Sequence, residues 1–251
     1  MKPTFIITSA IVTNMGAFNE QSRLLQTLDT VKSIRLKFDN ANIILAEGGK
    51  SLPTSELWHH LRQSVNVFLD MTSNEQIQHL HNNVMNQVDN KHEMGGISGL
   101  SKSVAELTLM ANVLDAIKNH DELQPIRESD RIFKISGRYQ LSPMFDADYY
   151  DQCEGRYVFK KADLSWMADA VNNVGTSHAF NSRLWSFDIS LLDQTLEKFE
   201  HMMADMEEIS QRHYIDIEHL LYKHIGPANA VEVEHTHLFG PLGPNAMIIY
   251  D

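Results

Sequence analysis

Three short apolar runs separated by helical patterns are the strongest constraint on the fold of this chain. Residues 5–12 are rich in β-branched side chains, and residues 41–46 and 65–70 also have the character of strands. Between them, residues 19–38 carry apolar side chains at nearly helical spacing, and residues 54–64 predict a shorter helix. Strands that alternate with helices form parallel sheets, with ligand sites at the carboxyl ends of the strands.

The rest of the chain continues this pattern with less regular spacing. Residues 73–99 are polar and lack a steady period, which is typical of a partly helical loop. Helices are predicted at 101–119, 191–211 and 213–225, and strands at 131–135, 157–161, 182–187, 230–237 and 246–250. No linker interrupts the chain. We therefore expect one α/β domain over residues 1–251, with a mixed, mostly parallel central sheet flanked by helices.

The charge and cysteine content exclude several classes of protein. Twenty-one basic against thirty-three acidic residues give a net charge of −12, and no lysine or arginine cluster follows a helix or strand, which argues against nucleic-acid binding. The single Cys153 excludes an intrachain disulfide and fits a reducing cytoplasm. No apolar run approaches the length of a transmembrane segment, and residues 5–12 are too short for a secretory signal. A cytoplasmic location is expected.

An anion-binding site is indicated where the strand at 131–135 ends. Lys134 lies within this strand, and Gly137, Arg138 and Tyr139 follow it closely. Glycine allows a ligand to approach the backbone, and the arginine fork matches phosphate or carboxylate geometry. A hairpin turn with a surface arginine is the alternative interpretation. The first interpretation gains weight from the rest of the chain.

Histidine and tryptophan provide weaker signals. His235 and His237 alternate on the strand predicted at 230–237, so both imidazoles would share one face. Without a third clear ligand, a phosphate or acceptor contact is favoured over a zinc site. Trp185 could stack on a sugar ring, but packing in the core of the sheet is the favoured interpretation.

The order of these elements resembles the GT-A glycosyltransferases, whose single α/β domain binds a nucleotide-sugar at the carboxyl ends of its sheet. Thr8 and Ser9 look like the end of the first strand and its nucleoside-binding turn. The resemblance implies that Glu47, at the end of the second strand, holds the base or ribose; an exposed glutamate before a flexible turn is the alternative. It also implies that Lys102, at a helix start, lies near the diphosphate.

The resemblance fails at the metal-binding motif. The family usually carries Asp-x-Asp at the end of the strand that here runs into Ser136 and Arg138. A divalent metal, Mn or Mg, is therefore doubtful, and the resemblance implies that Lys134 and Arg138 supply the positive charge to the leaving diphosphate. Asp146 and Asp148 form a later Asp-x-Asp, which remains an alternative metal site.

Asp216 and Glu218 resemble the acidic helix start that supplies the catalytic base in inverting members of the family. A carboxylate there would take the proton from the acceptor hydroxyl. On a helix the two side chains point in different directions, so at most one would face the pocket easily, and Glu218 is preferred. The alternative is a carboxylate that stabilises the helix N-terminus.

The sequence thus predicts a glycosyltransferase that moves a sugar from a nucleotide-sugar donor to a glycan or other hydroxyl acceptor, in surface-glycan or polysaccharide synthesis. Residues 1–140 would form the nucleotide-binding half and residues 141–251 the acceptor side. A noncatalytic glycan- or protein-binding member of the same fold is the alternative. A nucleotidyltransferase is a weaker one, because no phosphate-cradling glycine loop is present.

Overall fold

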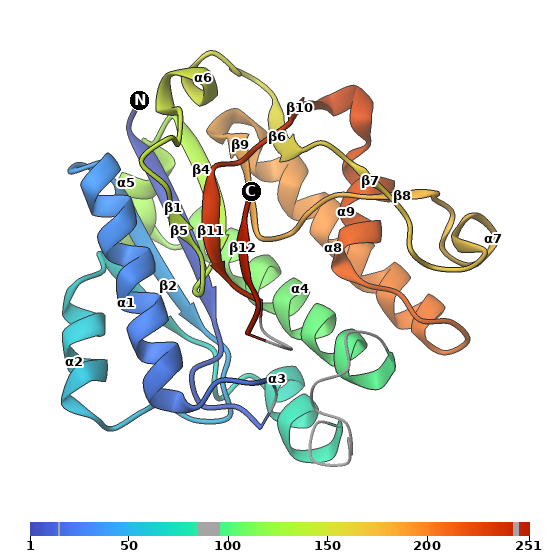
Figure 1. The fold of residues 1–251 in the computed structure, drawn as a ribbon, viewed down its shortest axis with the longest axis horizontal. Helices are drawn as coiled ribbons and strands as arrows, with labels where there is room; N and C mark the ends of the chain where they lie inside the picture. Colours follow the sequence, from blue (N-terminus) through green and yellow to red (C-terminus); the bar gives the residue numbers. More distant parts are fainter. Residues whose placement is uncertain (15, 85–95, 243–245) are drawn as a thin grey trace.

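The computed structural model describes residues 1–14, 16–84, 96–242 and 246–251. Its centre is a seven-stranded sheet (Figure 1). In spatial order the strands are β10 (Ala230–Val233), β6 (Tyr157–Lys160), β9 (Leu184–Asp188), β4 (Arg131–Ser136), β1 (Pro3–Ser9), β2 (Asn42–Glu47) and β3 (Val67–Asp70).

The sheet is mixed and mostly parallel, as predicted. β1 pairs in parallel with both β2 and β4, β2 with β3, and β10 with β6. β9 alone runs antiparallel, between β4 and β6. The carboxyl ends of β1, β2 and β4 therefore meet at one edge, together with the amino-terminal end of β9.

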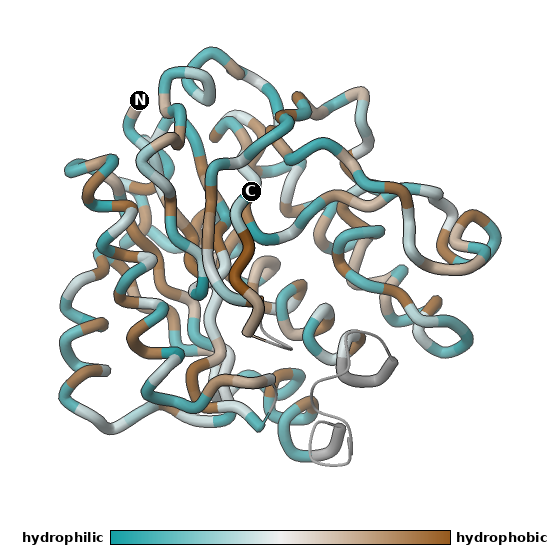
Figure 2. The backbone as a smooth tube through the Cα atoms, viewed as in Figure 1, coloured by the Kyte–Doolittle hydropathy of each residue, from teal (hydrophilic) through white to brown (hydrophobic). Residues whose placement is uncertain are grey.

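Helices cover both faces of the sheet (Figure 1). On one face lie α1 (Glu20–Lys37) and α2 (Glu56–Gln63), and on the other α4 (Gly96–Asn119), α8 (Leu192–Ser210) and α9 (Ile217–Ile225). Side chains alternate along β1, so Phe5 and Ile7 pack into the α1 core while Ile6 packs into the α4 core. The strands are accordingly hydrophobic, whereas α1 and α2 alternate in hydropathy along their length (Figure 2).

Shorter elements connect and extend this framework. The helical ones are α3 (Glu75–His79), the π-helix η1 (Leu80–Val84), α5 (Gln124–Arg127), α6 (Ala147–Asp151) and α7 (Ala170–Val174). A second sheet has the order β12 (Ile248–Tyr250), β11 (Leu238–Pro241), β5 (Gln140–Leu141), and β7 (Asp163–Leu164) pairs with β8 (His178–Ala179). Within the described ranges, no helix combines the length and apolarity that crossing a membrane requires.

Two predicted boundaries are wrong because of hydrogen bonds that the sequence pattern does not show. β1 ends at Ser9 rather than residue 12, since the Glu47 carboxylate accepts hydrogen bonds from the Ser9 hydroxyl and the Ile11 amide. The helix predicted at 213–225 begins only at Ile217, because Asp216 caps it. Of the polar stretch 73–99, residues 85–95 lie outside the described residues.

The strand predicted at 230–237 is also wrong beyond Val233. β10 ends there, and His237 has a positive φ of 55° just before β11 begins. Such a backbone conformation is incompatible with an extended strand. His235 and His237 therefore do not alternate along a strand.

Candidate functional site

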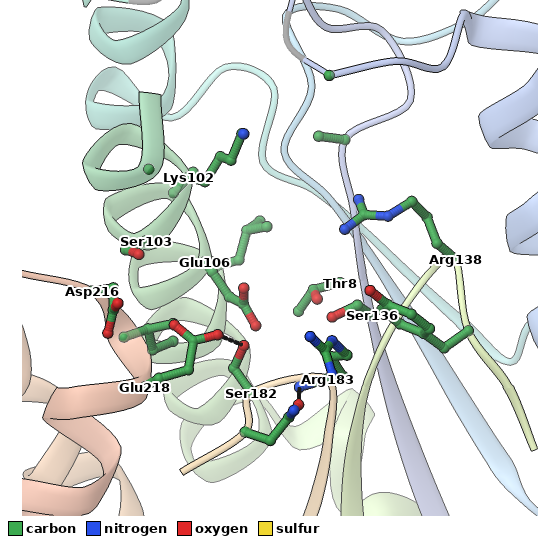
Figure 3. Close-up of a pocket in the computed structure, with 18 of the residues that line it drawn as sticks. Thr8, Lys102, Ser103, Glu106, Ser136, Arg138, Ser182, Arg183, Asp216 and Glu218 are labelled. Carbon is green, nitrogen blue, oxygen red and sulfur yellow. Dashed lines mark hydrogen bonds between the residues drawn. The ribbon is translucent and has the colours of Figure 1, made fainter. Parts of the chain in front are cut away.

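A cavity of about 660 Å³ opens at the carboxyl ends of the central parallel strands. Thr8 and Ser9 of β1, Gly48 after β2 and Ser136 of β4 form one side of it. The first half of α4 forms the opposite wall, and the residues before β9, the β7 region and the start of α9 complete it (Figure 3). This is the edge at which open α/β sheets bind ligands.

Four lysine and arginine side chains of the described residues line the cavity. Lys102 of α4 and Arg138 after β4 point into it from opposite walls (Figure 3), and Arg23 and Arg183 also line it. Burial, reinforced by repulsion from Arg138, lowers the pKa of Arg23 to about 10. Burial also lowers the pKa of Lys102, and the charges of Arg138 and Arg23 add to this effect. The fold thus holds like charges close together, and their repulsion lowers its stability. An anionic ligand would remove this repulsion.

Arg138 carries an unpaired donor beside the cavity. Its Nε is buried and has no hydrogen-bond partner among the described residues. An unpaired buried donor is costly and uncommon in native proteins. A phosphate oxygen within reach of the guanidinium would supply the missing acceptor.

Two carboxylates of α9 also line the cavity. Asp216 is the N-cap: its Oδ1 accepts from the His219 amide at 3.0 Å and from the ring Nδ1–H at 2.6 Å. Glu218 accepts a hydrogen bond from the Ser182 hydroxyl at 2.6 Å (Figure 3). Burial raises the pKa of Glu218 to about 7, with a further contribution from the Asp216 carboxylate. A carboxyl that titrates near neutrality suits proton transfer.

His81 borders the cavity near the end of β2. Its Nε2 lies 2.9 Å from the carbonyl oxygen of Gly48, so Nε2 must carry the proton and Nδ1 is left as an acceptor. The side chain is 1% exposed, and Nδ1 has no partner within the described ranges. Burial lowers the pKa of His81, which keeps the ring neutral. The atom can therefore accept a hydrogen bond from a hydroxyl or amino group of a ligand.

Solved structures share this arrangement of strands and helices. The galactosyltransferase LgtC, solved with donor and acceptor sugar analogues, matches 93% of this chain and 73% of its own length with a TM-score of 0.50 and 11% sequence identity. The chain has the GT-A glycosyltransferase fold. The resemblance in element order is confirmed at the level of the fold.

Two further solved glycosyltransferases match with TM-scores just below 0.5. The core-mannan synthase CmsA/Ktr4 of Aspergillus fumigatus, in its Mn/GDP form, has a TM-score of 0.48 at 13% identity, covering 92% of this chain and 72% of that one. Mouse xyloside xylosyltransferase 1 has a TM-score of 0.49 at 12% identity, covering 92% and 84%. No protein-family model and no functionally described protein matches the sequence.

Seven of the predicted site residues lie together in the cavity of this GT-A fold: Thr8, Ser9, Lys102, Arg138, Tyr139, Asp216 and Glu218. Tyr139 is 2% exposed, and the guanidinium carbons of Arg138 and Arg183 each lie 5.9 Å from its ring centroid. The expectation that only one of the two α9 carboxylates would face the pocket is wrong, because Asp216 precedes the helix as its cap. The roles of these residues in binding and catalysis stay predictions.

Glu47 lies behind the cavity wall and is not one of the residues that line the cavity. Its carboxylate is fully buried and accepts from the amides of Ile11 at 2.8 Å and Gly49 at 2.9 Å, and from the Ser9 hydroxyl. Burial raises its pKa, against the effect of these hydrogen bonds. The alternative of an exposed glutamate is wrong. Both carboxylate oxygens accept hydrogen bonds from the protein, so Glu47 does not contact a ribose. It fixes the loops after β1 and β2 instead.

Lys134 and Gly137 lie beneath the cavity surface. Lys134 is 0% exposed; its ammonium pairs with Glu106 and donates to the Ser136 hydroxyl at 2.9 Å and to the Ser182 carbonyl at 2.6 Å. It therefore does not point at a diphosphate. At Gly137, a Cβ would lie 3.1 Å from the Thr27 hydroxyl of α1, so glycine allows the helix rather than a ligand to approach.

The predicted histidine contact and the alternative metal motif both lie elsewhere. His235 and His237 have ring centroids 5.9 Å apart and are not among the cavity-lining residues. Asp146 caps α6, accepting from the Tyr149 amide at 3.1 Å, and α6 lies beside the N-terminus, at the far end of β1 from the cavity (Figure 1). The second Asp-x-Asp therefore cannot serve this site.

The residues of the site do not fit a divalent metal. Ser136 and Arg138 occupy the strand end at which the GT-A resemblance places an Asp-x-Asp, and cations surround it. Across the described ranges, no three histidine, cysteine or acidic side chains gather closely enough to hold an ion.

Sequence reasoning missed Glu106, Ser182, Arg183, Arg23 and His81. Glu106 could have been found, because it lies four residues after Lys102 and so shares a face of the same helix. Ser182 and Arg183 precede β9; an antiparallel strand starts at the edge where its parallel neighbours end. No sequence pattern around Arg23 or His81 indicates that either residue lines the cavity.

Proposed function

We propose that this protein is a glycosyltransferase that uses a nucleoside diphosphate-sugar donor. The unpartnered Nε of Arg138, in a cluster of cations at the carboxyl edge of a GT-A fold, carries the proposal. Lys102 and Arg138 would hold the diphosphate, and Thr8, Ser9 and the free Nδ1 of His81 would contact the nucleoside. The predicted cytoplasmic location and role in surface-glycan or polysaccharide synthesis are part of this proposal.

The cations and the carboxylates of the cavity suit the two halves of the reaction. As the bond from the anomeric carbon to the diphosphate oxygen breaks, the leaving group takes the electron pair and is stabilised by Lys102 and Arg138. An acceptor hydroxyl oxygen forms the new bond to that carbon and gives its proton to the Glu218 carboxylate. In this proposal, protein cations supply the charge that a metal would otherwise supply.

The first experiment is a thermal-shift panel of UDP, GDP and CDP, each with EDTA and with added Mn²⁺. We expect at least one nucleotide to raise the melting temperature, since a ligand that binds only the folded state stabilises it by about 2.7 kcal/mol at a hundred times its Kd. We expect the shift to persist in EDTA. A shift that requires Mn²⁺ would contradict the assignment of the charge to Lys102 and Arg138.

Arg138→Ala should weaken binding of that nucleotide roughly 10- to 150-fold, because a hydrogen bond to a charged group contributes about 1.5–3 kcal/mol. Isothermal titration calorimetry provides the measurement. Arg212→Ala, which removes an exposed arginine outside the cavity, is the matched control and should bind normally. Equal affinity in the two variants would show that the nucleotide does not contact Arg138.

A noncatalytic binding protein is the second candidate, and the replacement of the strand-end Asp-x-Asp by Ser136 and Arg138 favours it. Such a protein would give no shift with any nucleotide in the panel while still binding a glycan or protein. Hydrolysis or transfer of a donor sugar would exclude it.

A further inference from the structure

We propose that Trp166 is the acceptor platform, on which the apolar face of a pyranose ring stacks so that one hydroxyl reaches Glu218. The inference rests on the proposed function, to which it adds the chemical class of the acceptor: an uncharged saccharide. Trp166 follows β7 and lines the same cavity as Glu218.

Trp166 differs sharply from the other two tryptophans. Its side chain is 66% exposed, whereas Trp58 and Trp185 are 2% and 1% exposed. Trp185 packs in the sheet core against Phe159 and Phe199, so the interpretation favoured from the sequence is correct. The Trp166 ring lies 5.5 Å from that of Tyr214, which also lines the cavity. Two aromatic rings therefore stand together at an opening rather than in a core.

The backbone that presents Trp166 is fixed to α9. Ser165 Oγ lies 2.7 Å from His219 Nε2 and accepts from the Met167 amide at 3.0 Å. His219 is 1% exposed, and its other nitrogen pairs with Asp216 at 2.6 Å. The residues on both sides of Trp166 are thus tied to the helix that carries Glu218. This chain of hydrogen bonds holds the indole and the proposed base in one geometry.

The surroundings select a saccharide among the ligands that an aromatic surface could take. Asp163, Asn181 and Glu218 line the same cavity and offer carboxylate and amide groups to hydroxyls. A wholly apolar ligand would leave these groups unpaired, and an anionic one would meet carboxylates. A pyranose has C–H faces for the rings and hydroxyls for the polar groups, which is the combination that such a pocket binds.

Acrylamide quenching of tryptophan fluorescence tests the platform directly, because only Trp166 is accessible to the quencher. The protein would be tested both alone and saturated with any nucleotide found in the thermal-shift panel. Methyl glycosides of glucose, galactose, mannose and N-acetylglucosamine, with lactose and maltose, are the probes. We expect at least one to reduce quenching in a saturable manner. Because Trp166→Ala has no accessible tryptophan left to quench, its affinity for that saccharide is measured by isothermal titration calorimetry, where it should be about tenfold lower than that of the native protein. Trp166→Phe, which keeps a ring, should bind within about threefold of the native protein.

Val171→Ala is the matched control: Val171 is 59% exposed on the neighbouring α7 and does not line the cavity, so saccharide affinity should not change. A saccharide that binds equally well to Trp166→Ala would overturn the platform, and so would the absence of any protection across the panel. A nucleotide shift without saccharide protection refutes this inference alone. Saccharide protection without any nucleotide response refutes the transferase and leaves a glycan-binding protein.

Discussion

Glu218→Gln should lower the rate of sugar transfer by about 100- to 10,000-fold, the range that a positioned general base contributes. Glutamine has nearly the same shape, and its amide oxygen can still accept the hydrogen bond from the Ser182 hydroxyl. It cannot accept a proton from an acceptor hydroxyl. Release of the nucleoside diphosphate from a sugar donor that carries the nucleotide found in the thermal-shift panel, with and without acceptor, measures the effect.

Glu208→Gln is the control for this substitution, because Glu208 is exposed on α8 and lies outside the cavity. It should turn over at the native rate. If Glu218→Gln retained more than about a tenth of the native rate, another group would have to take the proton. Nucleotide affinity should be the same in both variants, since the proposed nucleotide contacts do not include Glu218.

The rate should also depend on pH through the same residue. Because the pKa of Glu218 is raised to about 7, the carboxylate form needed for proton acceptance increases as the pH rises from 6 to 8. The transfer rate should follow this increase in the native protein. In Glu218→Gln the residual rate should lack a rise centred near pH 7. A native profile that is flat across this range would contradict the assignment.

The stability of the protein should depend on pH in the opposite direction. A carboxyl whose pKa is higher in the folded state stabilises that state fully below its unfolded pKa, and this stabilisation is lost as the pH rises through about 7. Between pH 5 and pH 8 the contribution of Glu218 falls by roughly 1–3 kcal/mol. Urea unfolding of the native protein and of Glu218→Gln, each at pH 5 and pH 8, measures this contribution. Glu47 and the other ionisable groups titrate in both proteins, so their effects cancel in the comparison.

The alternation of strands and helices could be predicted because it is written in local patterns. The apolar runs that became β1 and β2 are buried between two layers of helices, so their composition alone indicates them. β3, at the edge of the sheet, is only partly buried and is indicated by its β-branched and aromatic residues. Their ends could not be predicted in the same way. β1 stops at Ser9 because of a carboxylate thirty-eight residues away, and nothing in residues 10–12 themselves shows it.

In the candidate site, too, local patterns could be predicted and contacts between distant residues could not. Lys102 and Arg138 were predicted because a basic residue near an expected helix start or strand end has a local signature. The predicted helix start is wrong for Lys102, because α4 begins at Gly96, six residues before it. Lys134 has the same signature, yet its ammonium is turned inward by Glu106 on α4 and by the carbonyl of Ser182. These partners come from elements that only the folded chain brings together.

Lys134→Ala should lower the free energy of unfolding by about 3–5 kcal/mol, the cost of breaking a buried ion pair by removing one partner. The substitution would leave Glu106, whose side chain is 21% exposed, without its cation. It would also remove the donor to Ser136 and Ser182, which hold the ends of β4 and the start of β9 together. Urea unfolding monitored by circular dichroism gives the change.

The exposed pair of Lys32 and Asp29, 3.3 Å apart with the lysine 66% exposed, is the matched control. Lys32→Ala should cost less than about 1 kcal/mol, since solvent screens such pairs. The double variant Lys134→Met, Glu106→Gln should recover much of the lost stability, because it removes both buried charges.

Nucleotide affinity distinguishes the two possible roles of Lys134. A Lys134→Ala protein of native stability whose nucleotide affinity falls would make Lys134 a diphosphate ligand, as the sequence predicted. A destabilised protein that binds the nucleotide at low temperature with near-native affinity would establish that Lys134 supports the site from below and that Lys102 and Arg138 meet the ligand.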